Sequence, residues 1–211
     1  MIDRVVATVN HDPVLQSDVE VQVRFAAMLD GKPAAPYSDA GRKAALERLI
    51  DQTLLHQQLR MVRILPVTSE DIAKRVTELR QQIPGCETEG GCKAVLARYG
   101  LSESEFAAKV RQQLEILRFV DVRLRPTVHV DRRSAEAYYN GTFSREMAKQ
   151  GGRKPPLSEV LPQIEEILAQ QRLDVVLNDL LKDLREHADI RIMDGSLPPN
   201  TPAVPPPEGM H

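Results

Sequence analysis

A long amphipathic stretch at residues 157–194 constrains the fold of this chain more than any other part of its 211 residues. Its apolar residues recur at three- and four-residue steps, which is the spacing of one helical face. Pro162 fits only in the first turn of a helix, so we expect the helix to begin near Ser158 and to end within residues 185–189. A helix with one apolar face needs a partner surface, so this stretch predicts a largely helical protein.

Two strand-like segments lie at opposite ends of the sequence. Ile190 and Ile192 alternate with Arg191 directly after the long helix, as residues of a strand do. The comparable signal is the run of branched residues in 3–9, which ends in turn residues at Asn10–Pro13. We therefore infer that the two ends of the chain pair. The predicted fold class is mostly α, a helical module with a small β ribbon formed by the N- and C-terminal strands.

The segments between the two ends predict further amphipathic helices, two of which begin with a capping box. Ser17–Glu20 and Ser102–Glu105 each place a hydroxyl and a carboxylate where they satisfy free backbone N–H groups. We expect residues 1–195 to form a single core built from both ends of the chain, with a flexible connection at 141–156. The proline-rich residues 196–211 are expected to be an extended, disordered tail.

The charge balance argues against several classes of function. Lys and Arg number 28 against 30 Asp and Glu, so no global field draws the protein to nucleic acid. One local excess, seven basic against three acidic residues in 109–133, suits either a solvated helix face or contact with anionic lipid or an acidic client. The sequence has no run of about twenty apolar residues that would form an integral membrane segment.

The residue types that carry catalysis or bind metals are scattered. The histidines lie far apart and none occurs in a metal-ligand spacing: His11, His56, His129, His187 and His211. Phosphate-binding, dinucleotide-binding and acyl-transfer motifs do not occur, so we expect no cofactor, no metal and no catalytic residue. Cys86 and Cys92 have five residues between them and match no redox or zinc pattern. They leave two alternatives open, a local disulfide or two free thiols.

The opening segment, RVVATVNHDPVLQSDVE, resembles the start of the SurA-like periplasmic chaperones, in which a strand, a turn and a short return lead into a capped helix. Three internal segments are similar in order and character to the same amino-terminal module: ALERLIDQTLLHQQL, VTSEDIAKRVTELR and YGLSESEFAAKVRQQLEILRFV. The final segment, PPLSEVLPQIEEILAQQRLDVVLNDLLKDLREHADIRI, is similar to that family's returning helix and strand. The resemblance covers nearly all of residues 2–194.

The resemblance implies an ATP-independent extracytoplasmic chaperone that binds unfolded polypeptides, outer-membrane protein precursors among them. Members of the family usually carry one or two parvulin prolyl isomerase domains before the returning helix, where this chain has only residues 140–156. We therefore expect no enzyme activity, and a periplasmic or otherwise exported protein whose signal peptide was removed. Three alternatives stay open: a prolyl isomerase of the same family, a non-catalytic helical adaptor for one specific partner, and a nucleic-acid binder that uses residues 109–133.

A chaperone of this kind needs accessible apolar area in a groove that adapts to many sequences. The candidate client-binding residues are Phe25, Met28, Leu29, Met61 and Tyr99. The alternative for each is an ordinary core position or an isolated surface position. The returning helix fills a groove either in its own chain or in a neighbour, so a domain-swapped homodimer is an alternative to the monomer.

Overall fold

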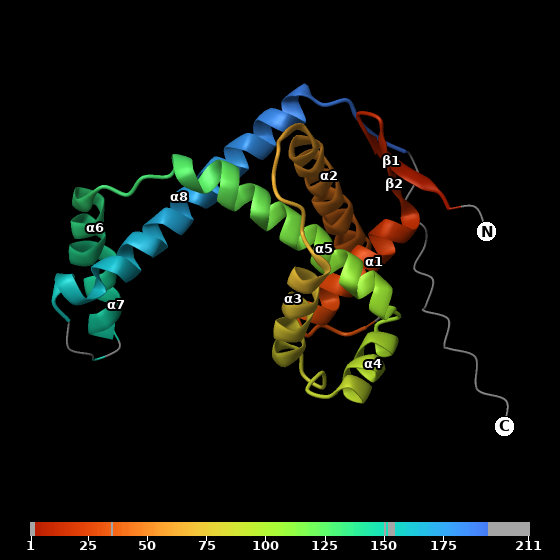
Figure 1. The fold of residues 1–211 in the computed structure, drawn as a ribbon, viewed down its shortest axis with the longest axis horizontal. Coiled ribbons are helices and arrows are strands. Elements are labelled where there is room, and N and C mark those ends of the chain that lie inside the picture. Colours follow the sequence, from red (N-terminus) through yellow and green to blue (C-terminus); the bar gives the residue numbers. More distant parts are fainter. Residues whose placement is uncertain (1–2, 35, 150, 152–154, 194–211) are drawn as a thin grey trace. The chain divides into compact units, whose positions relative to one another are not determined.

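The structure is a computed structural model that describes residues 3–34, 36–149, 151 and 155–193. Most of its elements are helices (Figure 1). In chain order the elements are β1 (Val5–Val9), β2 (Asp12–Leu15), α1 (Gln16–Leu29), α2 (Asp39–Met61), α3 (Ser69–Gln82), α4 (Glu89–Arg98), α5 (Glu103–Phe119), the π-helix η1 (Val120–Leu124), the 3₁₀ helix η2 (Arg125–Thr127), α6 (Arg132–Tyr138), the π-helix η3 (Tyr139–Phe143), α7 (Ser144–Lys149), α8 (Leu157–His187) and β3 (Ile190–Ile192). The chain forms two compact units, unit 1 with residues 1–117 and 184–211, and unit 2 with residues 118–183.

A three-stranded antiparallel sheet joins the two ends of the chain in unit 1. The central strand is β1, with β2 on one side and β3 on the other. Ala7 pairs with Ile192 across β1 and β3, and Val9 pairs with Asp12 across the β1–β2 hairpin. At the hairpin turn Asn10 takes a left-handed backbone conformation, with φ 55°, which asparagine tolerates better than most residues. The predicted fold class, mostly helical with a β ribbon from both ends, is confirmed.

One apolar core of unit 1 lies between the sheet, α1 and α2. Its buried residues come from the β1–β2 hairpin and from one side of each helix: Val6, Ala7, Val9, Val14, Val19, Val23, Ala45, Leu46, Leu49, Ile50 and Leu54. The C-terminal segment packs against the same core through Leu184, Ala188 and Ile190. Both ends of the sequence are therefore needed to complete this core.

Arg185 attaches the end of α8 to α2. Its Nε donates to Asp51 Oδ1 at 2.6 Å, and its Nη1 donates to Glu47 Oε2 at 2.9 Å. Its Nη2 also donates to the backbone oxygen of Glu47 at 3.2 Å. A planar guanidinium that binds two carboxylates in this way fixes orientation as well as distance, so it holds the last residues of α8, which belong to unit 1, against α2.

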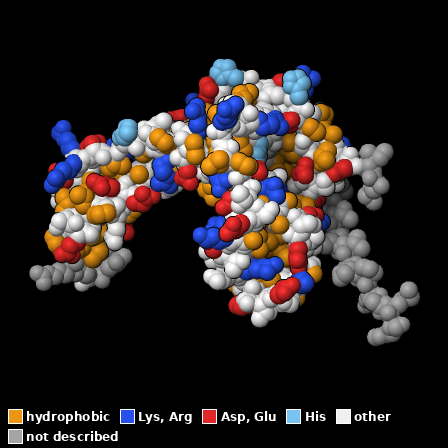
Figure 2. Space-filling model, in the orientation of Figure 1, with side chains coloured by type: hydrophobic (Ala, Val, Ile, Leu, Met, Phe, Trp, Pro, Cys, Tyr) orange, Lys and Arg blue, Asp and Glu red, His pale blue; other side chains and the backbone are white. Residues whose placement is uncertain are grey.

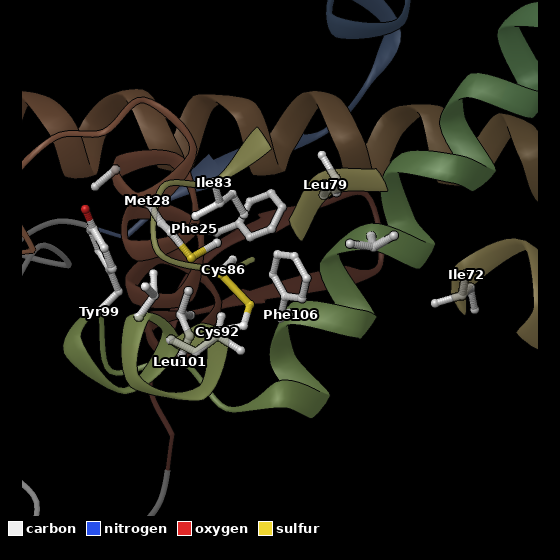
Figure 3. Packing of buried hydrophobic residues seen from close by; sticks show 14 of the residues in the cluster. Phe25, Met28, Ile72, Leu79, Ile83, Cys86, Cys92, Tyr99, Leu101 and Phe106 are labelled. Atoms are coloured by element: carbon white, nitrogen blue, oxygen red, sulfur yellow. A yellow bond between two sulfur atoms is a disulfide. The ribbon is translucent and has the colours of Figure 1, made fainter. Parts of the chain in front are cut away.

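The second core of unit 1 lies among α1, α3, α4 and α5 (Figure 3). The rings of Phe25 and Phe106 meet at its centre, with their centroids 5.8 Å apart. The surrounding buried residues are Ala27, Met28, Val67, Ile72, Leu79, Ile83, Cys86, Cys92, Val95, Leu96, Tyr99, Leu101 and Val110. Rings at this separation add to the free energy gained by burial, so α1 and α5 are firmly packed.

The two predicted capping boxes have different outcomes. Ser102 caps α5 as predicted, because its Oγ accepts from the Glu105 backbone N–H at 3.1 Å and Glu105 accepts from the Ser102 N–H at 2.7 Å. The prediction for Ser17 is wrong, since α1 already begins at Gln16 and the Ser17 hydroxyl donates to the Asp3 carboxylate. In this helix the Asp18 carboxylate accepts from the backbone N–H of Leu15 at 3.1 Å.

Unit 2 is a small helical body built on the greater part of α8. Ala135, Val160 and Ile164 are buried in it, and aromatic side chains from α6 and η3 pack around them. Asp131 caps α6, since its Oδ1 accepts from the Ser134 N–H at 2.8 Å. This bond and the Ser134 hydroxyl lower the pKa of Asp131 to about 2.

The boundaries of α8 agree with the sequence pattern. The helix begins at Leu157, one residue before the predicted start, and ends at His187 within the predicted range. Pro162 is the sixth residue of α8 and lies in its second turn, so the expectation that it occupies the first turn is wrong. The connection predicted at 141–156 contains the end of η3 and the whole of α7, and its flexibility stays a prediction. The tail predicted at 196–211 lies outside the described residues.

Candidate functional site

Three of the five predicted client-binding residues lie inside the second core of unit 1. Phe25 and Met28 are each 2% exposed, and Tyr99 is 6% exposed. Figure 3 shows their side chains among the other core residues. The Tyr99 hydroxyl donates to the backbone oxygen of Lys32 at 2.8 Å, which satisfies its polar end. In this structure these three side chains fill the core of unit 1 and do not line an open groove.

The other two predicted residues are exposed but belong to different places. Leu29 is the last residue of α1. Met61 is the last residue of α2, and 77% of its surface is accessible to solvent. Met61 lines a shallow hollow beside the β1–β2 turn. Hydrogen bonds link α2 to this turn, since Asn10 Nδ2 donates to Gln57 Oε1 at 2.7 Å and Gln57 Nε2 donates to Asp12 Oδ2 at 2.9 Å. The five residues therefore do not form one surface.

Cys86 and Cys92 are joined as a disulfide, drawn in yellow in Figure 3. Both residues are buried, and the bond ties the turn after α3 to α4. Gly91 is required here, because a Cβ at this position would collide with the Gly85 carbonyl oxygen. Thr88 accepts a hydrogen bond from the Gly91 N–H at 3.1 Å and caps α4. The disulfide therefore fixes α4 against the second core.

A hollow of about 430 Å³, the first hollow, lies between α1, α2 and the loop that connects them. Its wall is built from small and apolar residues: Val23, Ala26, Ala27, Pro33, Pro36, Gly41, Ala44 and Ala45. Tyr37 also lines it, and burial raises the pKa of its hydroxyl. At the rim Lys32 Nζ donates to Asp30 Oδ2 at 2.7 Å, and this bond lowers the pKa of the Asp30 carboxyl. The hollow is thus apolar inside, with charged groups at its edge.

The second hollow, of about 440 Å³, lies between α2, α3 and α5. Leu55, Ile116 and Leu117 supply its apolar surface, and Leu117 is half exposed. Arg48 lines this hollow and the first hollow as well. Because one side chain borders both spaces, they follow each other along α2. The periodicity of the sequence predicted that α2 is largely buried, and it did not predict the two hollows. The small side chains of Gly41, Ala44 and Ala45 were the sequence feature that could have indicated them.

Two titratable groups lie between the helices of unit 1, His56 half-buried and Lys109 buried. Burial lowers the pKa of His56, whose Nδ1 lies 3.7 Å from Glu115 Oε2. Burial also lowers the pKa of Lys109, which is 7% exposed. Desolvation disfavours the charged form of each base, so each loses its proton at a lower pH than it would in water. No group of three His, Cys, Asp or Glu residues in the described part of the chain is arranged to hold a metal ion.

The surface of the protein mixes charged and apolar side chains. On the face shown in Figure 2, Lys and Arg alternate with Asp and Glu, and hydrophobic side chains lie between them. Such a surface has no single sign of charge to attract a polyanion. Among the described residues, no helix combines the length and the apolar character that crossing a membrane demands.

Comparison with protein families gives one match. Residues 2–119, more than half of the 211 residues, match a family model described as the SurA-like N-terminal domain. The matched segment begins before β1 and ends at the last residue of α5, so it includes the sheet hairpin, both hollows and the disulfide. No curated protein matches the chain significantly.

Proposed function

Because the chain belongs to the SurA-like N-terminal domain family, we propose that it is an ATP-independent chaperone that works outside the cytoplasm. Its clients would be unfolded polypeptides, with outer-membrane protein precursors as the main class. The observation that carries this proposal is the family match over β1 to α5, the part of the chain that holds the two hollows.

The geometry of unit 1 supports binding of unfolded chains. Each hollow offers an apolar surface open to solvent, and a client side chain that enters it leaves water at a gain of roughly 25 cal/mol per Å² of apolar area. The client loses conformational freedom when it binds, which keeps each contact weak. Weak contacts at several places slow aggregation and still allow release without a nucleotide.

The same proposal assigns no catalysis to the chain. The family match covers the amino-terminal module alone, and η3 and α7 occupy part of the interval in which the resemblance implies a parvulin domain. A prolyl isomerase needs a site that binds and twists the prolyl bond. We therefore expect that the protein slows client aggregation and leaves proline-limited refolding unchanged.

The test uses the purified full chain with an unfolded β-barrel client and two unrelated unfolded soluble proteins. Light scattering reports client aggregation with and without ATP, and refolding of a proline-limited model protein reports isomerase activity. We expect suppression of aggregation at equimolar protein, equal with and without ATP, and no faster refolding. If several unrelated clients aggregate at an unchanged rate at a few-fold excess of the protein, the chaperone proposal is wrong. An adaptor for one folded partner then becomes the better account.

A further inference from the structure

One face of α2 runs through both hollows. Gly41, Ala44 and Ala45 line the first hollow, Arg48 lines both, and the second hollow continues with Asp51, Gln52 and Leu55. These positions follow three- and four-residue steps, so they lie on one side of the helix. From Gly41 to Leu55 the helix rises about 21 Å, the length of six or seven residues of extended chain. We call this face of α2, with its two hollows, the α2 furrow.

One cation of the α2 furrow makes no direct hydrogen bond or ion pair within the described residues. Asp51 binds Arg185 at 2.6 Å, Arg75 binds Glu78 at 3.0 Å, and Asp30 binds Lys32 at 2.7 Å. Arg48 is exposed and, within the described residues, has neither a hydrogen bond nor an ion pair, and its positive charge helps the Lys32 bond to lower the pKa of Asp30. It lies where the two hollows meet. The furrow therefore presents an available guanidinium between two apolar surfaces.

We propose that the α2 furrow binds an extended client segment in which an acidic side chain lies between two apolar side chains. This inference rests on the proposed chaperone function and names the class of segment that it takes. The acid pairs with Arg48, and the apolar side chains enter the first and the second hollow. On α2, the centre of the residues that line the first hollow and the centre of those that line the second are about seven positions apart, which corresponds to about 10 Å along the helix. Three residues of polyproline II chain cover about 9 Å and return to the same face, so the apolar residues lie about three positions apart.

The experiment measures peptide binding by fluorescence anisotropy with the full chain. The probe is a labelled nine-residue peptide with two leucines three positions apart and one glutamate between them, in a glycine and serine background. Two further peptides carry glutamine or lysine in place of the glutamate. An exposed ion pair contributes modestly, so we expect the glutamate peptide to bind about two- to fivefold more tightly than the glutamine peptide at low salt. The difference shrinks as salt increases.

Substitutions at Arg48 assign this preference to the furrow. Arg48→Gln removes the preference for glutamate, and Arg48→Glu reverses it in favour of the lysine peptide. Ala44→Glu places a carboxylate one helical turn before Arg48, where it competes with the client acid. Lys43→Gln is the matched control, because Lys43 is an exposed cation on the same helix outside both hollows, and it leaves the preference unchanged. Replacing either leucine of the peptide by glycine weakens binding about fivefold or more.

The outcomes separate this inference from the chaperone proposal. The furrow inference is overturned if the glutamate peptide fails to bind the wild-type protein, or if the Arg48→Glu variant still prefers that peptide. Either result overturns it even when the protein suppresses aggregation. If the Arg48 variants change the peptide preference as expected and the wild-type protein still fails to suppress aggregation, the furrow stands as a peptide site and the chaperone proposal fails. The circular dichroism of each variant confirms that the exposed substitutions leave the fold intact.

Discussion

The buried ion pair between Arg42 and Glu20 gives the sharpest test of how unit 1 is held together. Arg42 lies on α2 and is 2% exposed, and its Nε donates to Glu20 Oε1 on α1 at 2.8 Å. Its Nη1 also donates to the backbone oxygen of Tyr37 at 3.3 Å. Arg42→Ala leaves the Glu20 carboxylate and the Tyr37 carbonyl without this partner. The buried cation thus links α1, the connecting loop and α2.

The magnitude follows from the burial of the two partners. Removing one member of a buried pair costs about 3 to 5 kcal/mol, and we take the lower end because 20% of the Glu20 side chain is in contact with solvent. A loss of about 3 kcal/mol lowers the Tm of a chain of this size by roughly 6 to 12 °C. Glu20→Ala and the double variant complete a thermodynamic cycle with a coupling free energy of about 1 to 3 kcal/mol.

Urea unfolding followed by circular dichroism measures these free energies. Lys43→Ala is the control, since the neighbouring exposed side chain is expected to change the unfolding free energy by less than about 0.5 kcal/mol. A loss below about 1 kcal/mol for Arg42→Ala, or a coupling free energy near zero, would refute the reasoning. The helices would then be held by apolar packing alone.

Three further predictions concern the sheet, the disulfide and the half-buried His56. A chain that ends at Asp189 is expected to lose hydrogen-exchange protection in β1, because β1 loses its β3 partner, whereas removal of residues 196–211 leaves that protection unchanged. Unchanged protection after the longer deletion would contradict the pairing. In protein recovered from an oxidising compartment, alkylation and mass measurement are expected to find no free thiol at Cys86 or Cys92, and Cys92→Ser is expected to lower the unfolding free energy by about 2 kcal/mol. Burial lowers the pKa of His56, so the unfolded chain binds the proton more readily, and the unfolding free energy is expected to fall as the pH drops below about 6.5. His56→Gln flattens this dependence in denaturation curves between pH 7.5 and 5, and an equally steep curve for the variant would assign the effect to other groups.

The sequence pattern was sufficient for the elements whose signals are local. The alternation of Ile190 and Ile192 and the branched run in β1 predicted the pairing of the two ends, which the register confirms. Ser102 and Glu105 predicted the start of α5 because a capping box involves only four successive residues. The same rule gave a wrong prediction for Ser17, because the Asp3 carboxylate, which precedes β1, binds the Ser17 hydroxyl. Contacts of this kind are not visible in a short window of sequence.

The candidate site was less predictable because burial depends on which helices close over a face. Periodicity placed Phe25 and Met28 near the end of α1, but it did not show that α3, α4 and α5 cover that end. Met28→Glu, which an exposed groove residue would tolerate, is therefore expected to destabilise the second core, and a loss of helical content would check this. The position of Arg48 between the two hollows also could not be predicted from the sequence, because the structure is needed to show which neighbouring charges already bind other partners.

The sheet has a consequence for the order in which the protein acquires its fold. Ala7 and Ile192, which pair across β1 and β3, are 185 positions apart. A ribosome that adds 5 to 20 residues per second needs roughly 10 to 40 s to make the second partner after the first. Throughout that interval β1 has only β2 beside it in the sheet, and the core that it shares with α1 and α2 still lacks Leu184, Ala188 and Ile190. The last strand to be synthesised therefore sets the earliest moment at which unit 1 reaches its full stability.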